Sequence, residues 1–302
     1  MDLIEVRGVR KVFSSGLLQN KRTIALDGID LSMGEEPEIL TLAGESGSGK
    51  TTLARIILGL TEPTEGTVRF QGRVLRKREV KEHIQPIFQN PYEAFNPFKT
   101  VEKYLSETER ALGKRRIDDA LKTVELDAAG VLGKYPHELS GGQLQRLAIA
   151  RALIASPRLL IADEPVSMVD ASLRMSVLNF FKRLKSDGVS IIYITHDLAT
   201  AYYISDRICV MFRGNIVEMG NVEEVLERPL HPYTQLLLES IPSADPVHRH
   251  GRELKAHEIA EKEAKGCLFA SRCEHATDDC SEKTPPATST DGRIVRCFRY
   301  SD

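Results

Sequence analysis

One glycine-rich run carries the residue types and spacing that bind a polyphosphate. Two glycines are separated by four residues and followed directly by Lys50 and Thr51, which is the pattern of a phosphate-binding loop. Glycines let the backbone wrap around phosphates so that successive N–H groups point at negatively charged oxygen. The lysine of such a loop reaches the β- and γ-phosphates, and the threonine hydroxyl holds Mg²⁺. We therefore expect an ATP site formed by Gly44, Glu45, Ser46, Gly47, Ser48, Gly49, Lys50, Thr51 and Thr52.

The residues on either side of this loop predict the strand and the helix that it requires. Residues 39–43 are mostly apolar and typical of a buried strand, and residues 52–58 have the pattern of a helix. This order places the N-terminus of a helix against the phosphates, where its N–H groups favour negative charge.

Two carboxylates follow a second apolar run. Residues 159–162 predict a strand that ends in Asp163 and Glu164 and is stopped by Pro165. Because α/β folds bind ligands at the carboxyl ends of their strands, both side chains should lie near the phosphates. We expect Asp163 to hold Mg²⁺, directly or through water, and Glu164 to polarise the attacking water as general base.

Strands and helices alternate along most of the chain, which predicts an α/β fold with a mostly parallel core sheet. Early strands are expected at 4–12 and 29–33, with turns near Gly16 and Gly28, and a strand pair at 67–70 and 84–88. Later expected elements are helices at 101–112 and 117–126, a segment at 138–155, a helix at 172–186, a strand at 189–195, a hairpin of 208–212 and 216–219, and a helix at 231–241.

Composition and charge limit the class of protein. The chain has 302 residues, 41% of them hydrophobic, and a net charge of −2. It is long enough for one large α/β domain and an appendage. Nothing in the charge balance supports a nucleic-acid partner, and basic runs at 73–81 and 114–116 are interpreted as solvated faces. With no apolar stretch of the ~18–20 residues that cross a bilayer and no secretory signal at the acidic N-terminus, we expect a cytoplasmic protein that meets the membrane only through a partner.

Residues 139–143, Leu-Ser-Gly-Gly-Gln, resemble the signature of the ATP-binding cassette (ABC) ATPases. A capping serine and two glycines before a helix make a second anion site. Two ATPase domains of this family pair head to tail. The resemblance therefore implies that the ATP of the partner is contacted by Ser140, Gly141, Gly142 and Gln143.

The same resemblance assigns roles to other strand ends and loops. Gln89 matches the glutamine that contacts Mg²⁺ and the attacking water, and His196 matches the switch histidine that contacts the γ-phosphate. Asp170 matches the loop that communicates across the dimer, and Phe13 is the candidate for stacking on adenine. The implied catalytic residues are Glu164, His196 and Gln89, and the implied Mg²⁺ ligands are Thr51, Gln89 and Asp163.

Three features narrow the resemblance, which covers roughly residues 3–242, to the ATPases of oligopeptide and dipeptide importers. They are residues 88–97, residues 231–238 and the positions of four cysteines. The implied architecture is an ABC-type domain at 1–242 with a mostly parallel core sheet, an antiparallel β subdomain and a helical subdomain at about 89–155. Residues 243–302 would form a small C-terminal Cys-rich extension, in which residues 243–265 are charged and poor in apolar residues.

Four of the five cysteines lie in the last 36 residues, separated by five, six and sixteen residues. Structural zinc usually binds tighter pairs, whereas four widely spaced thiolates suit an iron–sulfur cluster. The importer subfamily carries a [4Fe–4S] cluster at such a segment, and zinc is the weaker alternative. Two disulfides, disfavoured in a reducing cytoplasm, and free thiols are the other interpretations, and Cys209 is expected in the core. The implied ligands are Cys267, Cys273, Cys280 and Cys297.

The function implied by these features is ATP hydrolysis that powers the import of peptides or similar small solutes at the cytoplasmic side of the membrane. Expected partners are a second ABC ATPase subunit, as a second copy or a related chain, two transmembrane permease subunits and an extracellular substrate-binding protein. Alternatives are an importer ATPase for oligosaccharides or nickel, a soluble ABC protein of translation or DNA repair, and a metal or redox sensor with a secondary ATPase.

Overall fold

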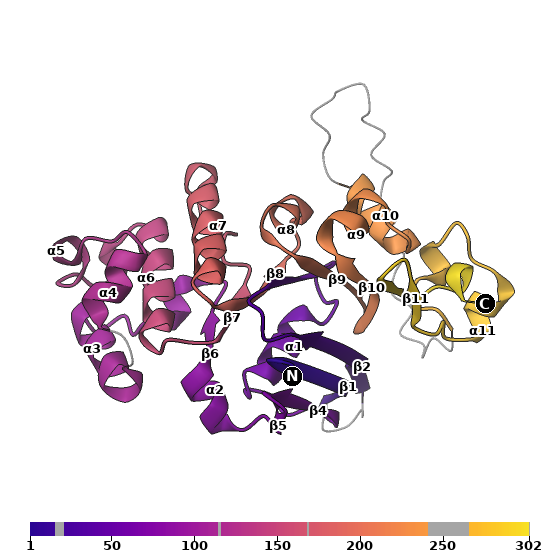
Figure 1. Ribbon diagram of the computed structural model, residues 1–302, viewed down its shortest axis with the longest axis horizontal. Coiled ribbons are helices and arrows are strands. Elements are labelled where there is room, and N and C mark those ends of the chain that lie inside the picture. Colours follow the sequence, from indigo (N-terminus) through magenta and orange to yellow (C-terminus); the bar gives the residue numbers. More distant parts are fainter. Residues whose placement is uncertain (16–20, 114–115, 168, 241–265, 302) are drawn as a thin grey trace.

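Two β-sheets form the framework of the protein (Figure 1). The computed structural model describes residues 1–15, 21–113, 116–167, 169–240 and 266–301. The smaller sheet has the strand order β2 (Lys21–Met33), β1 (Ile4–Ser15), β4 (Glu65–Phe70), β5 (Arg73–Val74). The larger sheet has the order β11 (Thr288–Thr290), β12 (Arg293–Val295), β10 (Asn215–Asn221), β9 (Arg207–Phe212), β3 (Ile39–Ala43), β8 (Ser190–Thr195), β7 (Leu159–Asp163), β6 (Ile84–Ile87).

The two sheets differ in strand direction. Strands β9, β3, β8, β7 and β6 pair in parallel, and β10, β12 and β11 continue the larger sheet antiparallel at one edge. All pairs of the smaller sheet are antiparallel. The predicted mostly parallel core sheet and antiparallel β subdomain are therefore confirmed.

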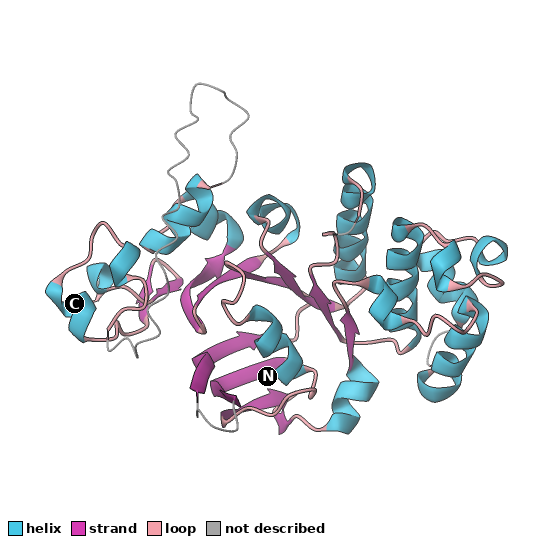
Figure 2. Ribbon diagram, turned by 180° about the vertical axis from the view of Figure 1, so that it is seen from behind, coloured by secondary structure: helices cyan, strands magenta, loops and turns pink. Residues whose placement is uncertain are grey.

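Helix α1 lies between the two sheets (Figure 2). Its side chains Leu53 and Ile57 are fully buried in one core cluster with residues from both sheets. The α-helices of the described residues are α1 (Lys50–Ile57), α2 (Lys77–His83), α3 (Val101–Leu112), α4 (Ile117–Thr123), α5 (Ala128–Val131), α6 (Gly141–Ile154), α7 (Ala171–Ser186), α8 (Leu198–Ile204), α9 (Val222–Glu227), α10 (Pro232–Glu239) and α11 (Asp278–Glu282).

Helices α3 to α6 gather at one end of the molecule (Figure 1). Leu105, Leu121 and Leu144 on three of these helices are fully buried in a second core cluster. Leu160 on β7 belongs to the same cluster, so the helical group packs against the larger sheet. Helices α3 to α6 therefore form a group in the region where a helical subdomain was expected, and its bounds of about 89–155 stay a prediction.

The C-terminal residues are joined to the larger sheet. Strand β12 pairs with β10, with Val295 opposite Glu218. The Arg293 guanidinium, only 4% exposed, donates to the carbonyl oxygens of Glu224 (2.9 Å) and Arg228 (2.6 Å). Residues 266–301 therefore share both a sheet and buried polar contacts with the preceding part of the chain.

Some expectations for the first ninety residues are wrong. The segments at 67–70 and 84–88 do not pair, because β4 and β6 belong to different sheets and α2 separates them. Gly28 does not end a strand. Its φ of 68° accommodates a bulge where the pairing of β2 with β1 shifts between Ile29 and Leu26. The turn near Gly16 and residues 243–265 lie outside the described residues.

Truncating the α1 core side chain tests this packing. Leu53 is fully buried between the sheets, so Leu53→Ala should lose about 2–5 kcal/mol of folding free energy. The measurement is the midpoint of urea denaturation followed by circular dichroism. Leu60→Ala is the matched control, since Leu60 is 62% exposed, and equal losses in the two variants would contradict this account.

Candidate nucleotide site

The phosphate-binding loop fits its surroundings only with glycine at two positions. At Gly44 (φ 142°) an added Cβ would lie 2.2 Å from the Met211 carbonyl oxygen, and at Gly49 (φ 106°) 2.7 Å from the Ala25 carbonyl oxygen. The loop backbone is thus pressed against β9 and β2, which fixes its path between β3 and α1. At the loop tip Ser46 and Gly47 are exposed, whereas the side chains of Ser48 and Lys50 are buried.

Lys50 lies inside this loop. It is only 6% exposed, and its ammonium group donates to the carbonyl oxygens of Gly44 (2.8 Å) and Glu45 (2.8 Å). Burial lowers the pKa of Lys50, while Glu164, Asp163 and Glu45 act in the opposite direction. The Lys50 ammonium thus lies within the loop and near the carboxylates of Asp163 and Glu164.

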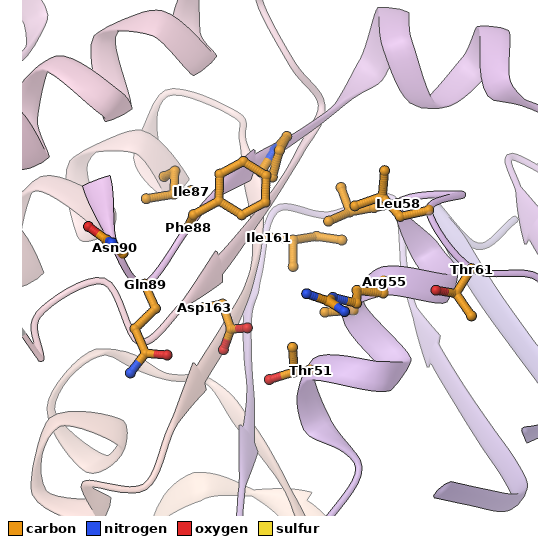
Figure 3. Close-up of a pocket in the computed structure, with 13 residues that line it drawn as sticks. Thr51, Arg55, Leu58, Thr61, Ile87, Phe88, Gln89, Asn90, Ile161 and Asp163 are labelled. Atoms are coloured by element: carbon orange, nitrogen blue, oxygen red, sulfur yellow. The ribbon is translucent and has the colours of Figure 1, made fainter. Parts of the chain in front are cut away.

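The three side chains predicted to bind Mg²⁺ line one cavity of about 530 Å³. Asp163 lies between Gln89 and Thr51 in this cavity (Figure 3). Thr51 and Asp163 share a side-chain hydrogen bond, which lowers the pKa of Asp163 against the stronger upward effect of burial. A carboxylate, a hydroxyl and an amide oxygen are ligands that Mg²⁺ accepts, so the donor set fits this ion.

Gln89, Glu164 and His196 also come together, although three different strands precede them. The Gln89 amide donates to one carboxylate oxygen of Glu164 (3.0 Å), and His196 Nδ1 lies 3.0 Å from the other. Glu164 adopts a φ of 45°, and its N–H donates to the Ile194 carbonyl oxygen (2.9 Å). This backbone conformation, rare outside glycine, turns the carboxylate out of the strand toward its two neighbours.

The signature residues begin helix α6. The Ser140 hydroxyl accepts from the Gln143 N–H (3.3 Å), and the Gln143 side chain accepts from the Ser140 N–H (3.0 Å), which is a capping box. A Cβ on Gly142 would lie 2.7 Å from the Leu173 side chain. In Figures 1 and 2 helix α6 stands apart from α1, with the end of the larger sheet between them. The signature is not brought to the phosphate loop of its own chain.

Phe13 and Asp170 stand outside these groups. Phe13 is 45% exposed on β1, with the Lys11 ammonium 5.1 Å from its ring centre. Asp170 precedes α7 and is exposed, and its carbonyl oxygen accepts from the Leu173 N–H (2.9 Å). Their predicted roles in adenine stacking and dimer communication stay predictions.

Two residues that the sequence did not single out contact the phosphate loop. The Glu45 N–H donates to the Tyr233 hydroxyl oxygen (2.9 Å), and Arg272 donates to both carboxylate oxygens of Glu45 (3.1 and 2.8 Å). These partners lie 188 and 227 residues from Glu45. A local sequence pattern cannot predict contacts between residues that are so far apart in the sequence.

The four C-terminal cysteines line a separate cavity of about 230 Å³. All are free thiols, and burial raises the pKa of Cys267, Cys273 and Cys297. Within the described part of the chain, no three Cys, His, Asp or Glu side chains are grouped to hold a metal ion. The predicted cluster and its zinc alternative are therefore not confirmed. Cys209 is fully buried, as expected, and burial raises its pKa to about 12.

Two family models match the chain. The model described as ABC transporter matches residues 26–167, and the model described as oligopeptide/dipeptide transporter, C-terminal region, matches residues 217–280. The oligopeptide transport ATP-binding protein OppF of Salmonella typhimurium is 38% identical over 91% of this chain and 87% of its own length. The putative oligopeptide transport ATP-binding protein YkfD of Bacillus subtilis is 39% identical over 99% and 96%.

Solved structures show the same fold. The ATP-binding cassette MJ0796, in a dimeric post-hydrolysis state bound to ADP and Pi, matches with a TM-score of 0.64 and 27% identity over 72% of this chain and 98% of its own. CbiO1 of Clostridium perfringens, part of the ABC transporter complex cbiONQ, matches with a TM-score of 0.65 and 26% identity over 75% and 91%. Among the described residues of the present chain, no helix combines the length and apolarity of a membrane span.

A single methyl group should disturb the phosphate loop. Gly44→Ala places a Cβ against the Met211 carbonyl oxygen, so the loop must shift and ATP affinity should fall by roughly tenfold or more. Titration with a fluorescent ATP analogue measures the dissociation constant. Gly34→Ala, whose Cβ meets nothing within 4 Å, is the control. Unchanged affinity in Gly44→Ala would refute the tight fit.

Proposed function

The chain belongs to the ATP-binding cassette family of transporter ATPases, and we propose that it is the ATP-hydrolysing subunit of a peptide importer. The observation that carries the proposal is the Glu164 carboxylate, held between Gln89 and His196 beside the phosphate loop. The match of residues 217–280 to the oligopeptide/dipeptide transporter region supports peptides as cargo. Oligosaccharides and nickel are the alternative cargoes.

In this proposal the side chains around the phosphate loop and the strand ends bind the phosphates and the metal ion and activate the attacking water. Lys50 leaves the loop carbonyls for the β- and γ-phosphates, and Glu164 accepts a proton from the attacking water. Gln89 and His196 hold the carboxylate by its two oxygens, and His196 also reaches the γ-phosphate. Thr51, Gln89 and Asp163 would hold Mg²⁺, which neutralises charge that develops on the phosphates.

Hydrolysis is proposed to need two such subunits. Helix α6 stands apart from α1 of its own chain (Figure 1), so Ser140 and its neighbours are available to the nucleotide of a partner, with Phe13 stacked on adenine and Asp170 at the dimer contact. The dimeric state of MJ0796 supports this arrangement. The partner would be a second copy or a related chain, and the pair would act at the cytoplasmic face of the membrane on two permease subunits fed by an extracellular binding protein.

Residues 1–242 are proposed as the ATPase domain and residues 243–302 as an extension that holds a [4Fe–4S] cluster. Four free thiols around one cavity support this ligand set. Zinc is the weaker alternative, because the spacing lacks the tight pairs of structural zinc sites.

Replacing the proposed general base separates binding from hydrolysis. Glu164→Gln keeps a side chain of the same size between Gln89 and His196 but cannot take up a proton. ATP should still bind, while turnover falls by roughly 10²–10⁴-fold. Phosphate release by the assembled transporter is the readout, and Glu125→Gln, an exposed carboxylate paired with Arg183, is the matched control. Turnover near that of the wild type would remove Glu164 from the mechanism.

The cluster proposal predicts the metal content of the protein. Protein purified without oxygen should be brown and contain about four irons and four sulfides per chain. Cys273→Ser should lose most of this iron, whereas Cys209→Ala, at a cysteine buried in β9, should keep it. Elemental analysis decides the matter, and stoichiometric zinc without iron would refute the cluster.

A further inference from the structure

Glu45 in the phosphate loop is tied down through each of its polar groups. Its N–H donates to the Tyr233 hydroxyl oxygen (2.9 Å), and its carbonyl oxygen accepts from Lys50 (2.8 Å). Its carboxylate accepts two hydrogen bonds from Arg272, at 3.1 and 2.8 Å. Two of these three partners come from the C-terminal part of the chain.

Arg272 is held in place by the cysteine segment. It directly precedes Cys273, at the end of the turn Ala270–Arg272. Its guanidinium lies over the rings of Phe212 (5.7 Å) and Phe269 (5.5 Å). Phe269 lines the cysteine cavity, and Cys273 packs against the buried cluster to which Phe269 belongs. The position of the guanidinium therefore depends on how this cavity is formed.

Tyr233 belongs to the same aromatic group. Its ring centre lies 4.5 Å from that of Phe212 and 5.5 Å from that of Phe269. Ala43, the last residue before the phosphate loop, is part of the same buried cluster. A continuous packed path therefore runs from the cysteine cavity to the loop.

The ion pair changes the electrostatics of the nucleotide site. Without Arg272, the Glu45 carboxylate would stand as an unpaired negative charge at a loop that binds a polyanion, and like charges repel at this range. When Lys50 turns from the Glu45 carbonyl to a phosphate, Tyr233 and Arg272 remain as the contacts that hold this residue. They should keep the loop in one shape before and after binding, which reduces the ordering cost of binding.

We propose that Arg272 is a positioning residue for the phosphate loop, and that the cysteine segment sets the ATP affinity of the subunit through it. The inference rests on the proposed ATPase function. It assigns the C-terminal cysteines a regulatory effect on nucleotide binding: when the segment loses its order, Arg272 leaves Glu45 and affinity for ATP falls.

A double-mutant cycle tests the pair. Arg272→Gln should raise the ATP dissociation constant and KM roughly five- to tenfold, with kcat changed less than about twofold in the assembled transporter. Glu45→Gln in the Arg272→Gln background should restore most of the affinity, because the unpaired charge is gone. Arg183→Gln, which removes the partner of exposed Glu125, is the control. An unchanged dissociation constant in Arg272→Gln, or added losses in the double variant, would overturn the pairing.

Two further measurements distinguish the loss of the ion pair from misfolding of the variant. Arg272→Lys keeps the positive charge, so it should bind ATP more tightly than Arg272→Gln does. If Arg272→Lys instead loses as much ATP affinity as Arg272→Gln and has a lower melting temperature, the variants misfold, and this result would count against the proposal. The difference in ATP affinity between the wild type and Arg272→Gln should also become smaller in high salt, because salt screens an ion pair that is partly exposed.

A separate experiment tests whether the cysteine segment acts on ATP binding through Arg272. Cys273→Ser should weaken ATP binding in the otherwise wild-type chain and add nothing in the Arg272→Gln chain. Undiminished affinity in Cys273→Ser would overturn the link. Binding of the ATP analogue is measured in the full chain whether or not it contains iron or hydrolyses ATP. A wild-type chain that binds no ATP would therefore contradict the proposed function, not this coupling.

Discussion

The close fit of the phosphate loop against its neighbouring backbones is the constraint on which the site depends. Gly44 and Gly49 approach carbonyl oxygens of β9 and β2 so closely that a methyl group cannot enter. The Gly214 N–H, in the turn between β9 and β10, donates to the Ser48 carbonyl oxygen (2.9 Å). Strand β9, strand β2 and the turn between β9 and β10 thus hold the loop from outside.

The parallel pairing of strands in the larger sheet positions the other side chains of the site. Strands β6, β7, β8 and β3 all end at one edge of the larger sheet. Asp163 is the last residue of β7, and Gln89, His196 and the phosphate loop follow the ends of the other three strands. The parallel pairing alone therefore brings residues from separate parts of the sequence together at this edge. Glu164, the residue proposed to act on water, adopts a positive φ directly after β7.

The sequence predicted the elements whose structure depends on residues that are close together in the chain. The phosphate loop, strand β3, the capping Ser140 and helices α3, α4 and α6 have compact signals in the sequence. Helix α2 was missed because none of its residues is buried, so it has no apolar period to detect. Gly28 suggested a turn, since sequence cannot tell a turn from a bulge that neighbouring strands absorb.

The contacts of Glu45 could not be predicted in this way, because they depend on how the C-terminal segment packs. That segment has two attachments of different strength. Its hairpin pairs with β10, and Arg293 is 4% exposed beside Glu218, which is fully buried. Glu218 in turn accepts from the His231 N–H (2.9 Å), which fixes the start of α10 and hence Tyr233.

The Arg272–Glu45 pair is the weaker attachment, with side chains that are 20% and 36% exposed. Partly exposed pairs contribute little to folding, so this contact can open while the buried hairpin keeps the segment in place. A firm anchor combined with a contact of low energy allows the segment to act on the phosphate loop without detaching from the protein.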